Sequence, residues 1–157
     1  MRRNGRWTVA VAACALAALA VPPAAPAQDD QARYRLANGC YAMEAGDRLV
    51  AKDGSGGYAA TATEGAQAEP LRMQATTLGQ YLLYGKEGDF LGTDQGAVAT
   101  EPSAGPTAEW RVENAPGGRF VLRLASTGEA LGVRDGRLVL GGEPTTVGFR
   151  AIEGCAT

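Results

Sequence analysis

The chain has 157 residues, among which glycine occurs 22 times and histidine is absent. Its 15 basic and 17 acidic side chains give a net charge of −2, which excludes the basic surface that nucleic-acid binding requires. Without histidine, Ser-His and Cys-His nucleophile pairs, histidine general-base catalysis and most zinc sites are excluded as well. We therefore predict a single domain that is not an enzyme and holds neither a metal nor a cofactor.

The first 27 residues resemble a secretory leader. Three arginines precede an uncharged apolar run over residues 9–21, and the small residues at 25–27 form a cleavage pattern. The run is shorter than the ~20 residues that span a membrane. We predict a signal peptide over residues 1–27, cleavage near Ala27, and a secreted chain with no membrane association after cleavage. Lipidation at Cys14, inside the apolar run, is the alternative.

Two cysteines follow the predicted leader, Cys40 and Cys155. In a secreted chain an even number of cysteines predicts a disulfide, with two free thiols as the alternative. Without the three arginines of the leader, 12 basic and 17 acidic side chains remain, so the mature chain has a net charge of −5. This composition predicts a soluble, mildly acidic domain, and we expect it to be a monomer.

One pattern recurs three times after the leader, over residues of about 40–79, 80–118 and 119–155. Apolar and aromatic positions align at spacings of 39 to 41 residues between the three segments. The aligned sets are Tyr41, Tyr81 and Phe120; Met43, Leu83 and Leu122; Tyr58, Val98 and Leu138; and Leu71, Trp110 and Phe149. An arginine follows each member of the last set.

Each repeat contains short strand patterns separated by turn sequences. Residues 81–84 and 120–122 are apolar or aromatic, whereas residues 71–74 and 110–113 alternate apolar with polar side chains, as half-buried strands do. Asp-Gly, Gly-x-x-Gly and Pro-Gly-Gly turns separate these runs. No segment keeps a helical period, so we predict four strands per repeat and an all-β fold.

Three repeats of about 40 residues with four strands each resemble the β-trefoil, whose six barrel strands are capped by three hairpins. The resemblance covers residues 40–155; we therefore divide the mature chain into an extension over residues 28–39 and a trefoil domain over residues 40–157. The leucine strands at residues 90–92 and 130–132 are most similar to trefoils of the fascin-like type. Ricin-type lectins carry a glutamine two residues before the closing aromatic, where this chain has Glu69, Ala108 and Val147.

The resemblance also places the chain ends together, because the first and last strands of such a barrel are neighbours. A bond between Cys40 and Cys155 then closes the barrel. The segment is further similar to the N-terminal module of secreted bacterial metal-dependent hydrolases of the amidohydrolase type. In that case the hydrolase part is absent from this chain.

Few side chains qualify as binding residues. Trp110 and Tyr58 align with aliphatic residues of other repeats and are predicted to lie in the core. Arg72, Arg111 and Arg150 recur at 39-residue spacing and are expected to point outward as a pseudo-threefold ring. The ring either binds an anion or, as the preferred interpretation, pairs with acids such as Glu69, Glu109 and Glu113.

Two further features complete the candidates. Tyr84 is expected to be the exposed aromatic residue. The carboxylates Asp53, Asp94 and Asp135 precede glycines and are interpreted as turn residues.

The predicted function is a non-catalytic secreted module that binds a carbohydrate, a cell-wall polymer or a protein. An accessory module of a hydrolase is the alternative, followed by an enzyme without a recognisable motif and by a protease inhibitor that uses residues 61–70.

Overall fold

The computed structural model describes residues 34–77 and 79–155, so the predicted signal peptide, its cleavage site and Cys14 lie outside the described residues. The described part is all-β, with two short 3-10 turns, η1 (Gly65–Gln67) and η2 (Pro116–Gly118). The strands are β1 (Cys40–Ala45), β2 (Arg48–Lys52), β3 (Tyr58–Ala62), β4 (Pro70–Thr77), β5 (Gln80–Tyr84), β6 (Phe90–Asp94), β7 (Ala97–Glu101), β8 (Glu109–Ala115), β9 (Arg119–Leu124), β10 (Leu131–Arg134), β11 (Arg137–Leu140) and β12 (Val147–Ala151). Four strands therefore lie in each repeat, as predicted.

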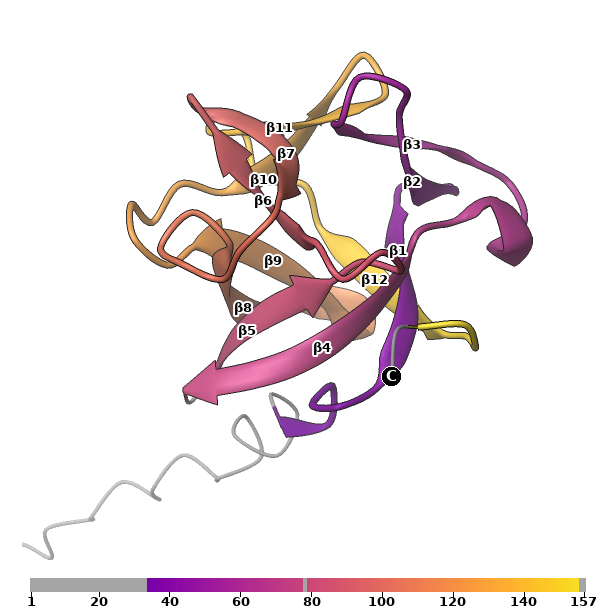
Figure 1. Cartoon of the computed structure of the whole chain (residues 1–157), viewed down its shortest axis with the longest axis horizontal. Helices are drawn as coiled ribbons and strands as arrows, with labels where there is room; N and C mark the ends of the chain where they lie inside the picture. The colour runs from indigo at the N-terminus through magenta and orange to yellow at the C-terminus, as the bar shows by residue number, and fades with distance from the viewer. Residues whose placement is uncertain (1–33, 78, 156–157) are drawn as a thin grey trace, which may run out of the picture.

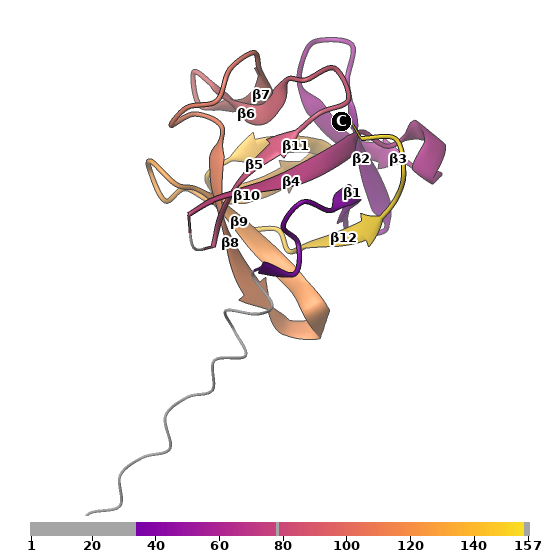
Figure 2. The same cartoon turned by 60° about the horizontal axis from the view of Figure 1, so that its bottom comes forward.

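Six strands form a closed barrel. Antiparallel pairs join β1 to β4, β4 to β5, β5 to β8, β8 to β9, β9 to β12 and β12 back to β1. The hairpins β2–β3, β6–β7 and β10–β11 lie together at one end, where β11 pairs with both β3 and β7 (Figure 1). The barrel has no free edge strand, because its first and last strands are paired along their length (Figure 2).

The core consists of the apolar side chains that alternate inward from the barrel strands. Met43, Leu83 and Leu122 are fully buried at equivalent positions of the three repeats, which confirms this aligned set. Tyr58, Val98 and Leu138 are buried beneath the hairpins, also as predicted. Trp110 has no exposed surface, and its indole Nε1 donates a 2.7 Å hydrogen bond to the carbonyl oxygen of Leu91. The polar end of the largest core side chain is thereby satisfied.

The last aligned set is wrong in the third repeat. Leu71 lies opposite Tyr41 and Trp110 lies opposite Tyr81, but the residue opposite Phe120 is Val147. Val147 therefore occupies the position that the sequence assigned to Phe149, which is only half-buried. The cause is a shorter connection: β12 begins nine residues after Leu138, whereas Trp110 follows Val98 by twelve. The residue two before the closing position is accordingly Thr145, which is not glutamine either.

The predicted extension contributes to the core. Leu36, in the turn before β1, is buried in the same hydrophobic cluster as the barrel side chains. The backbone N–H of Asn38 donates to the carbonyl of Met73, which ties this turn to β4. Tyr34, two residues earlier, is 53% exposed and is the most exposed large apolar side chain among the described residues. None of the described helical segments is long and apolar enough to cross a membrane.

Asp53 confirms its predicted role in a turn. Its Oδ1 accepts hydrogen bonds from the backbone N–H groups of Ser55 and Gly57 and from the Ser55 hydroxyl. Its Oδ2 lies 2.6 Å from Nη2 of Arg137, so this turn of the first repeat is tied to β11 of the third. The Ser55 hydroxyl, the backbone donors and Arg137 hold the pKa of Asp53 below its ordinary value, against the effect of burial.

We expect Asp53→Asn to lower the free energy of unfolding by about 1 kcal/mol at pH 7. Because folding lowers the pKa of Asp53, its contribution is present above the ordinary value of 3.8 and is lost as pH falls through the folded-state pKa. The difference between wild type and variant in urea denaturation is therefore expected to shrink in acid. Asp94→Asn, at an exposed carboxylate before the β6–β7 turn, is the control and is expected to change little. Equal losses in the two variants contradict the interpretation.

Candidate functional site

The three arginines do not form a threefold ring. Arg72 lies opposite Cys40 and Arg111 lies opposite Gln80, but Gly148 occupies the equivalent position in β12. Arg150 is displaced by two residues because the connection before β12 is shorter. All three side chains point away from the core, as predicted, but they do not share one face at equivalent heights. The predicted ring is therefore wrong.

The ion pairs also differ from those predicted. Arg150 Nη2 lies 2.5 Å from Glu44 Oε1, and Arg72 donates to the carbonyl of Asn38. The acids named from the sequence have other partners. Glu69 pairs with Lys52, Glu109 accepts a hydrogen bond from Thr76, and Glu113 pairs with Arg123.

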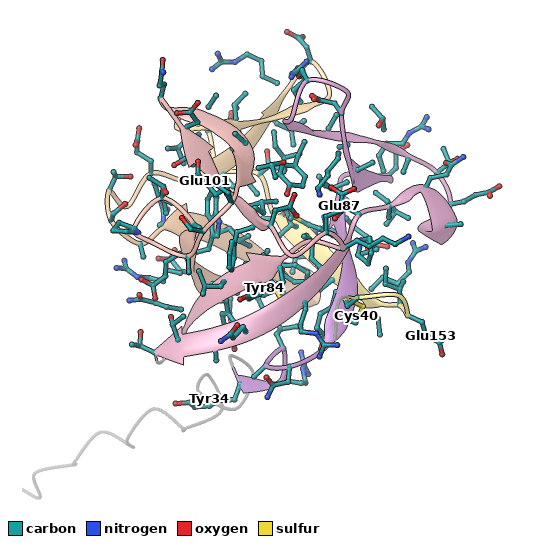
Figure 3. The ribbon with its side chains drawn as sticks, in the orientation of Figure 1. Tyr34, Cys40, Tyr84, Glu87, Glu101 and Glu153 are labelled. Carbon is teal, nitrogen blue, oxygen red and sulfur yellow. A yellow bond between two sulfur atoms is a disulfide. The ribbon has the colours of Figure 1, made fainter. Side chains whose placement is uncertain are left out.

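Tyr84 is half-buried, contrary to its predicted exposure. Its ring packs against Phe90, with centroids 4.2 Å apart, and its cross-strand neighbour in β4 is Arg72 (Figure 3). Two of the predicted candidates, Arg72 and Tyr84, thus lie side by side on the outer barrel face. Because Tyr84 leans on Phe90, it offers an edge and not a free ring face to a ligand.

A groove of about 290 Å³ lies beside the disulfide, where segments from all three repeats meet. We call it the first groove. It is lined by the loop between β3 and β4, by the loop between β5 and β6, and by the residues after β12. In Figures 1 and 2, η1 and the segment after β12 lie on the same side of the barrel. The lining residues are Gly65, Ala66, Ala68, Glu69, Pro70, Lys86, Ile152, Glu153 and Gly154.

The floor of the first groove is a small apolar cluster outside the barrel. Ala42, Leu49, Ala62 and Ala68 are buried there, and Ile152 packs against them. The backbone N–H of Glu69 donates to the carbonyl of Val50, which fixes the end of the β3–β4 loop to β2. The floor is therefore built from strand residues and does not depend on loop conformation alone.

Charged side chains form one wall of this groove. Glu69 Oε1 accepts a 2.8 Å hydrogen bond from the backbone N–H of Lys86 and lies 3.5 Å from Lys52 Nζ. Lys52 Nζ also lies 2.7 Å from Asp89 Oδ2 and 3.2 Å from Glu87 Oε2. Burial alone lowers the pKa of Lys52, but the hydrogen bond to Asp89 and the surrounding carboxylates outweigh it, so the pKa is raised. The ammonium group thus holds the β5–β6 loop against the first repeat.

Gly85 allows this arrangement. A Cβ atom at this position would lie 2.4 Å from Asp89 Oδ1 and 2.8 Å from Glu69 Oε1. Any larger residue therefore has to displace the two carboxylates that position Lys52 and the Lys86 backbone.

The opposite wall depends on the disulfide. β12 ends at Ala151, and the next residue is held by a 3.0 Å hydrogen bond from the Ile152 N–H to the carbonyl of Cys40. The bond between Cys40 and Cys155, whose Cα atoms are 5.8 Å apart, then fixes the segment that carries Glu153. Figure 3 shows Glu153 on the same side of the molecule as Cys40. The predicted disulfide thus closes the barrel ends and also holds one wall of the groove.

The sequence did not reveal this groove. Glu69, Lys86 and Glu153 are scattered over three repeats and belong to no motif. The one available signal was the unequal composition of equivalent loops, because an apolar floor needs Ala62 and Ala68 at turn positions that are usually polar. No group of three or more His, Cys, Asp or Glu side chains suited to a metal ion occurs within residues 34–77 and 79–155.

No protein-family model and no curated protein matches the chain. Solved structures do. A Polyporus squamosus lectin bound to a human-type influenza-binding epitope superposes with a TM-score of 0.61 and 10% identity, over 73% of this chain and 49% of the lectin. The lectin SeviL, bound to the asialo-GM1 saccharide, gives 0.60 and 18% over 73% of this chain and 98% of its own.

The chain is a β-trefoil. A family 43 β-1,3-galactosidase has the same fold, with a TM-score of 0.64 and 17% identity over 73% of this chain and 28% of the enzyme. The β-trefoil chain thus spans less than half of the Polyporus lectin and about a quarter of the galactosidase. At such identities the similarity establishes the fold alone. The fascin-like and hydrolase-linked resemblances find no support in the comparisons.

Proposed function

We propose that this β-trefoil is a secreted, non-catalytic module that binds a glycan through the first groove. The observation that carries the proposal is the groove itself, in which carboxylate, ammonium and backbone groups surround an apolar floor. Sugars present hydroxyl groups, which need both donors and acceptors, together with apolar ring faces. The trefoil lectins that resemble the chain in fold support the proposal.

The polar groups of the groove are suited to hydroxyl recognition. Glu69 is held on one oxygen by Lys52 and by the Lys86 backbone, and among the described residues no donor reaches Oε2. A preorganised carboxylate oxygen accepts a hydrogen bond without first losing side-chain freedom. Lys86 and Glu153 at the rim add an exposed donor and an exposed acceptor. At about 290 Å³ the groove lies just below the ~300 Å³ at which pockets for drug-sized ligands begin, which suits a single sugar ring.

Export is part of the same proposal. The apolar leader, the disulfide and the acidic mature composition support a chain that acts outside the cell. A disulfide of this kind persists in oxidising compartments and is rare in reducing ones.

The test is binding of the oxidised mature chain to insoluble chitin, cellulose, galactan and peptidoglycan, followed by titration with soluble oligosaccharides of the polymer retained. Gly65→Trp is designed to fill the groove, because a Cβ atom at Gly65 meets nothing within 4 Å and its φ is not positive. Gly54→Trp is the matched control, since Gly54 is equally open but lies in the β2–β3 turn outside the groove. We expect Gly65→Trp to abolish binding and Gly54→Trp to retain it. Retention by both, or binding to none of the polymers, refutes the proposal.

An accessory role within a longer hydrolase is a second candidate. It is favoured by the galactosidase, in which the matched fold occupies 28% of the length. The genomic sequence downstream of Thr157 tests it: a hydrolase domain in the same reading frame or in the same operon supports the role, and the absence of both counts against it.

A further inference from the structure

A second groove, of about 260 Å³, lies on another side of the barrel. It is lined by Thr76, Leu82, Ala104, Gly105 and Glu109, which come from the end of β4, from β5 and from the loop between β7 and β8. None of these residues lines the first groove, and none was singled out by the sequence as a binding residue except Glu109, as a partner for arginine.

The second groove is the pseudo-threefold equivalent of the first. Gly65 and Gly105 begin the same turn, in which the N–H three residues later, on Ala68 or Ala108, donates to the glycine carbonyl. The floors correspond as well. The cluster of Ala42, Leu49 and Ala68 beneath the first groove is matched by the cluster of Leu82, Phe90 and Ala108 beneath the second.

The anchoring of the two loops follows the same rule. In the first groove, the β3–β4 loop is tied to the β5–β6 loop of the next repeat by Glu69 and the Lys86 backbone. In the second, the Ser126 hydroxyl, in the next repeat, donates a 2.8 Å hydrogen bond to the carbonyl of Pro106. Both grooves are therefore built sites at the junction of consecutive repeats.

The chemistry of the two grooves differs at one wall. The register of β4 and β12 places Thr76 where the first groove has Ile152, because Met73 and Phe149 lie opposite the equivalent residues Leu83 and Met43. Threonine is smaller than isoleucine, so the apolar floor at Leu82 stays accessible from the groove. The Thr76 hydroxyl donates to Glu109 Oε1, which leaves a carboxylate beside an apolar floor.

We propose that the second groove is an additional sugar site that prefers an N-acetylhexosamine, which makes the domain bivalent. The acetamido methyl group packs on Leu82 and Ala104, and a ring hydroxyl or the acetamido N–H donates to Glu109. The first groove, whose floor is covered by Ile152 and whose walls carry charged groups, lacks this open apolar surface. This inference rests on the proposed glycan-binding function but concerns a separate site.

The experiment is an amide chemical-shift titration of the isotope-labelled, oxidised mature chain with N-acetylglucosamine and, in parallel, with glucose. We expect N-acetylglucosamine to shift the amides of residues 76, 104, 105 and 109, and glucose to bind there roughly fourfold more weakly, as loss of one buried methyl group predicts. Gly105→Trp is expected to remove these shifts, since a Cβ atom at Gly105 meets nothing within 4 Å. Thr76→Ile, which restores the side chain found in the first groove, is expected to weaken them. Gly54→Trp is again the control.

The outcomes separate the two proposals. Shifts at both grooves support both. Shifts confined to residues 65, 69, 86 and 153 overturn the second site and leave the first. Shifts confined to the second groove support this inference and overturn the assignment of the first groove. Equal affinity for glucose refutes the N-acetylhexosamine preference, and no shift at either groove overturns both sites.

Discussion

Trp110→Ala is expected to lower the free energy of unfolding by about 3 to 5 kcal/mol, a large part of the ~5 to 15 kcal/mol that a domain of this size has. The indole is completely buried and occupies the barrel interior, so its removal leaves a cavity that close-packed neighbours cannot fill. Trp110→Phe is the milder variant. It retains most of the apolar volume but leaves the Leu91 carbonyl without its 2.7 Å donor, and we expect a loss of about 2 kcal/mol.

Urea denaturation followed by circular dichroism measures both losses. Phe149→Ala is the comparison, because the sequence repeat assigns Phe149 to the same position as Trp110 whereas the structure places it half-buried at another register. We expect it to cost clearly less than Trp110→Ala. A cost for Phe149→Ala as large as that for Trp110→Ala contradicts the register, and a Trp110→Phe variant as stable as wild type contradicts the buried hydrogen bond.

The fold was predictable because threefold repetition makes its signals redundant. Met43, Leu83 and Leu122 each report the same core position, and turn sequences such as Asp135-Gly136 lie where both residues have positive φ. The error in the third repeat has the same origin. A repeat of Arg after an apolar residue at constant spacing is convincing when spacing is the only evidence. The shorter connection before β12 changed the register by two residues without disturbing that pattern.

The grooves were not predictable in the same way. A groove depends on which loops of neighbouring repeats approach one another, and this depends on long-range contacts such as Lys52 with Asp89, 37 residues apart. Sequence reasoning favoured residues that are conspicuous, arginine and tyrosine, over an isoleucine-to-threonine difference at equivalent positions. Thr76 and Ile152 become comparable only once the strand register is known.

Replacing both cysteines, Cys40→Ser with Cys155→Ser, is expected to lower the free energy of unfolding by about 3 to 5 kcal/mol. The disulfide closes a loop of 115 residues, and the entropy that such a link removes from the unfolded chain grows with loop length. The barrel is expected to persist, because β1 and β12 still pair over five residues from Tyr41 to Ala45. Urea denaturation measures the loss. Dithiothreitol is expected to destabilise the wild type by a similar amount and to leave the double variant unchanged.

The same substitution is expected to separate the two grooves. The wall of the first groove at Glu153 is anchored through the disulfide, whereas the equivalent wall of the second groove is Thr76, inside the continuous strand β4. At temperatures where the double variant stays folded, sugar-induced shifts at residues 65, 69, 86 and 153 should therefore weaken at least roughly tenfold, the effect of ~1.4 kcal/mol, while those at the second groove persist. Simultaneous loss at both grooves points to global loosening of the barrel. Retention at both shows that the Ile152 hydrogen bond and its packing on Leu49 suffice to hold the first wall, which contradicts a positioning role for the disulfide.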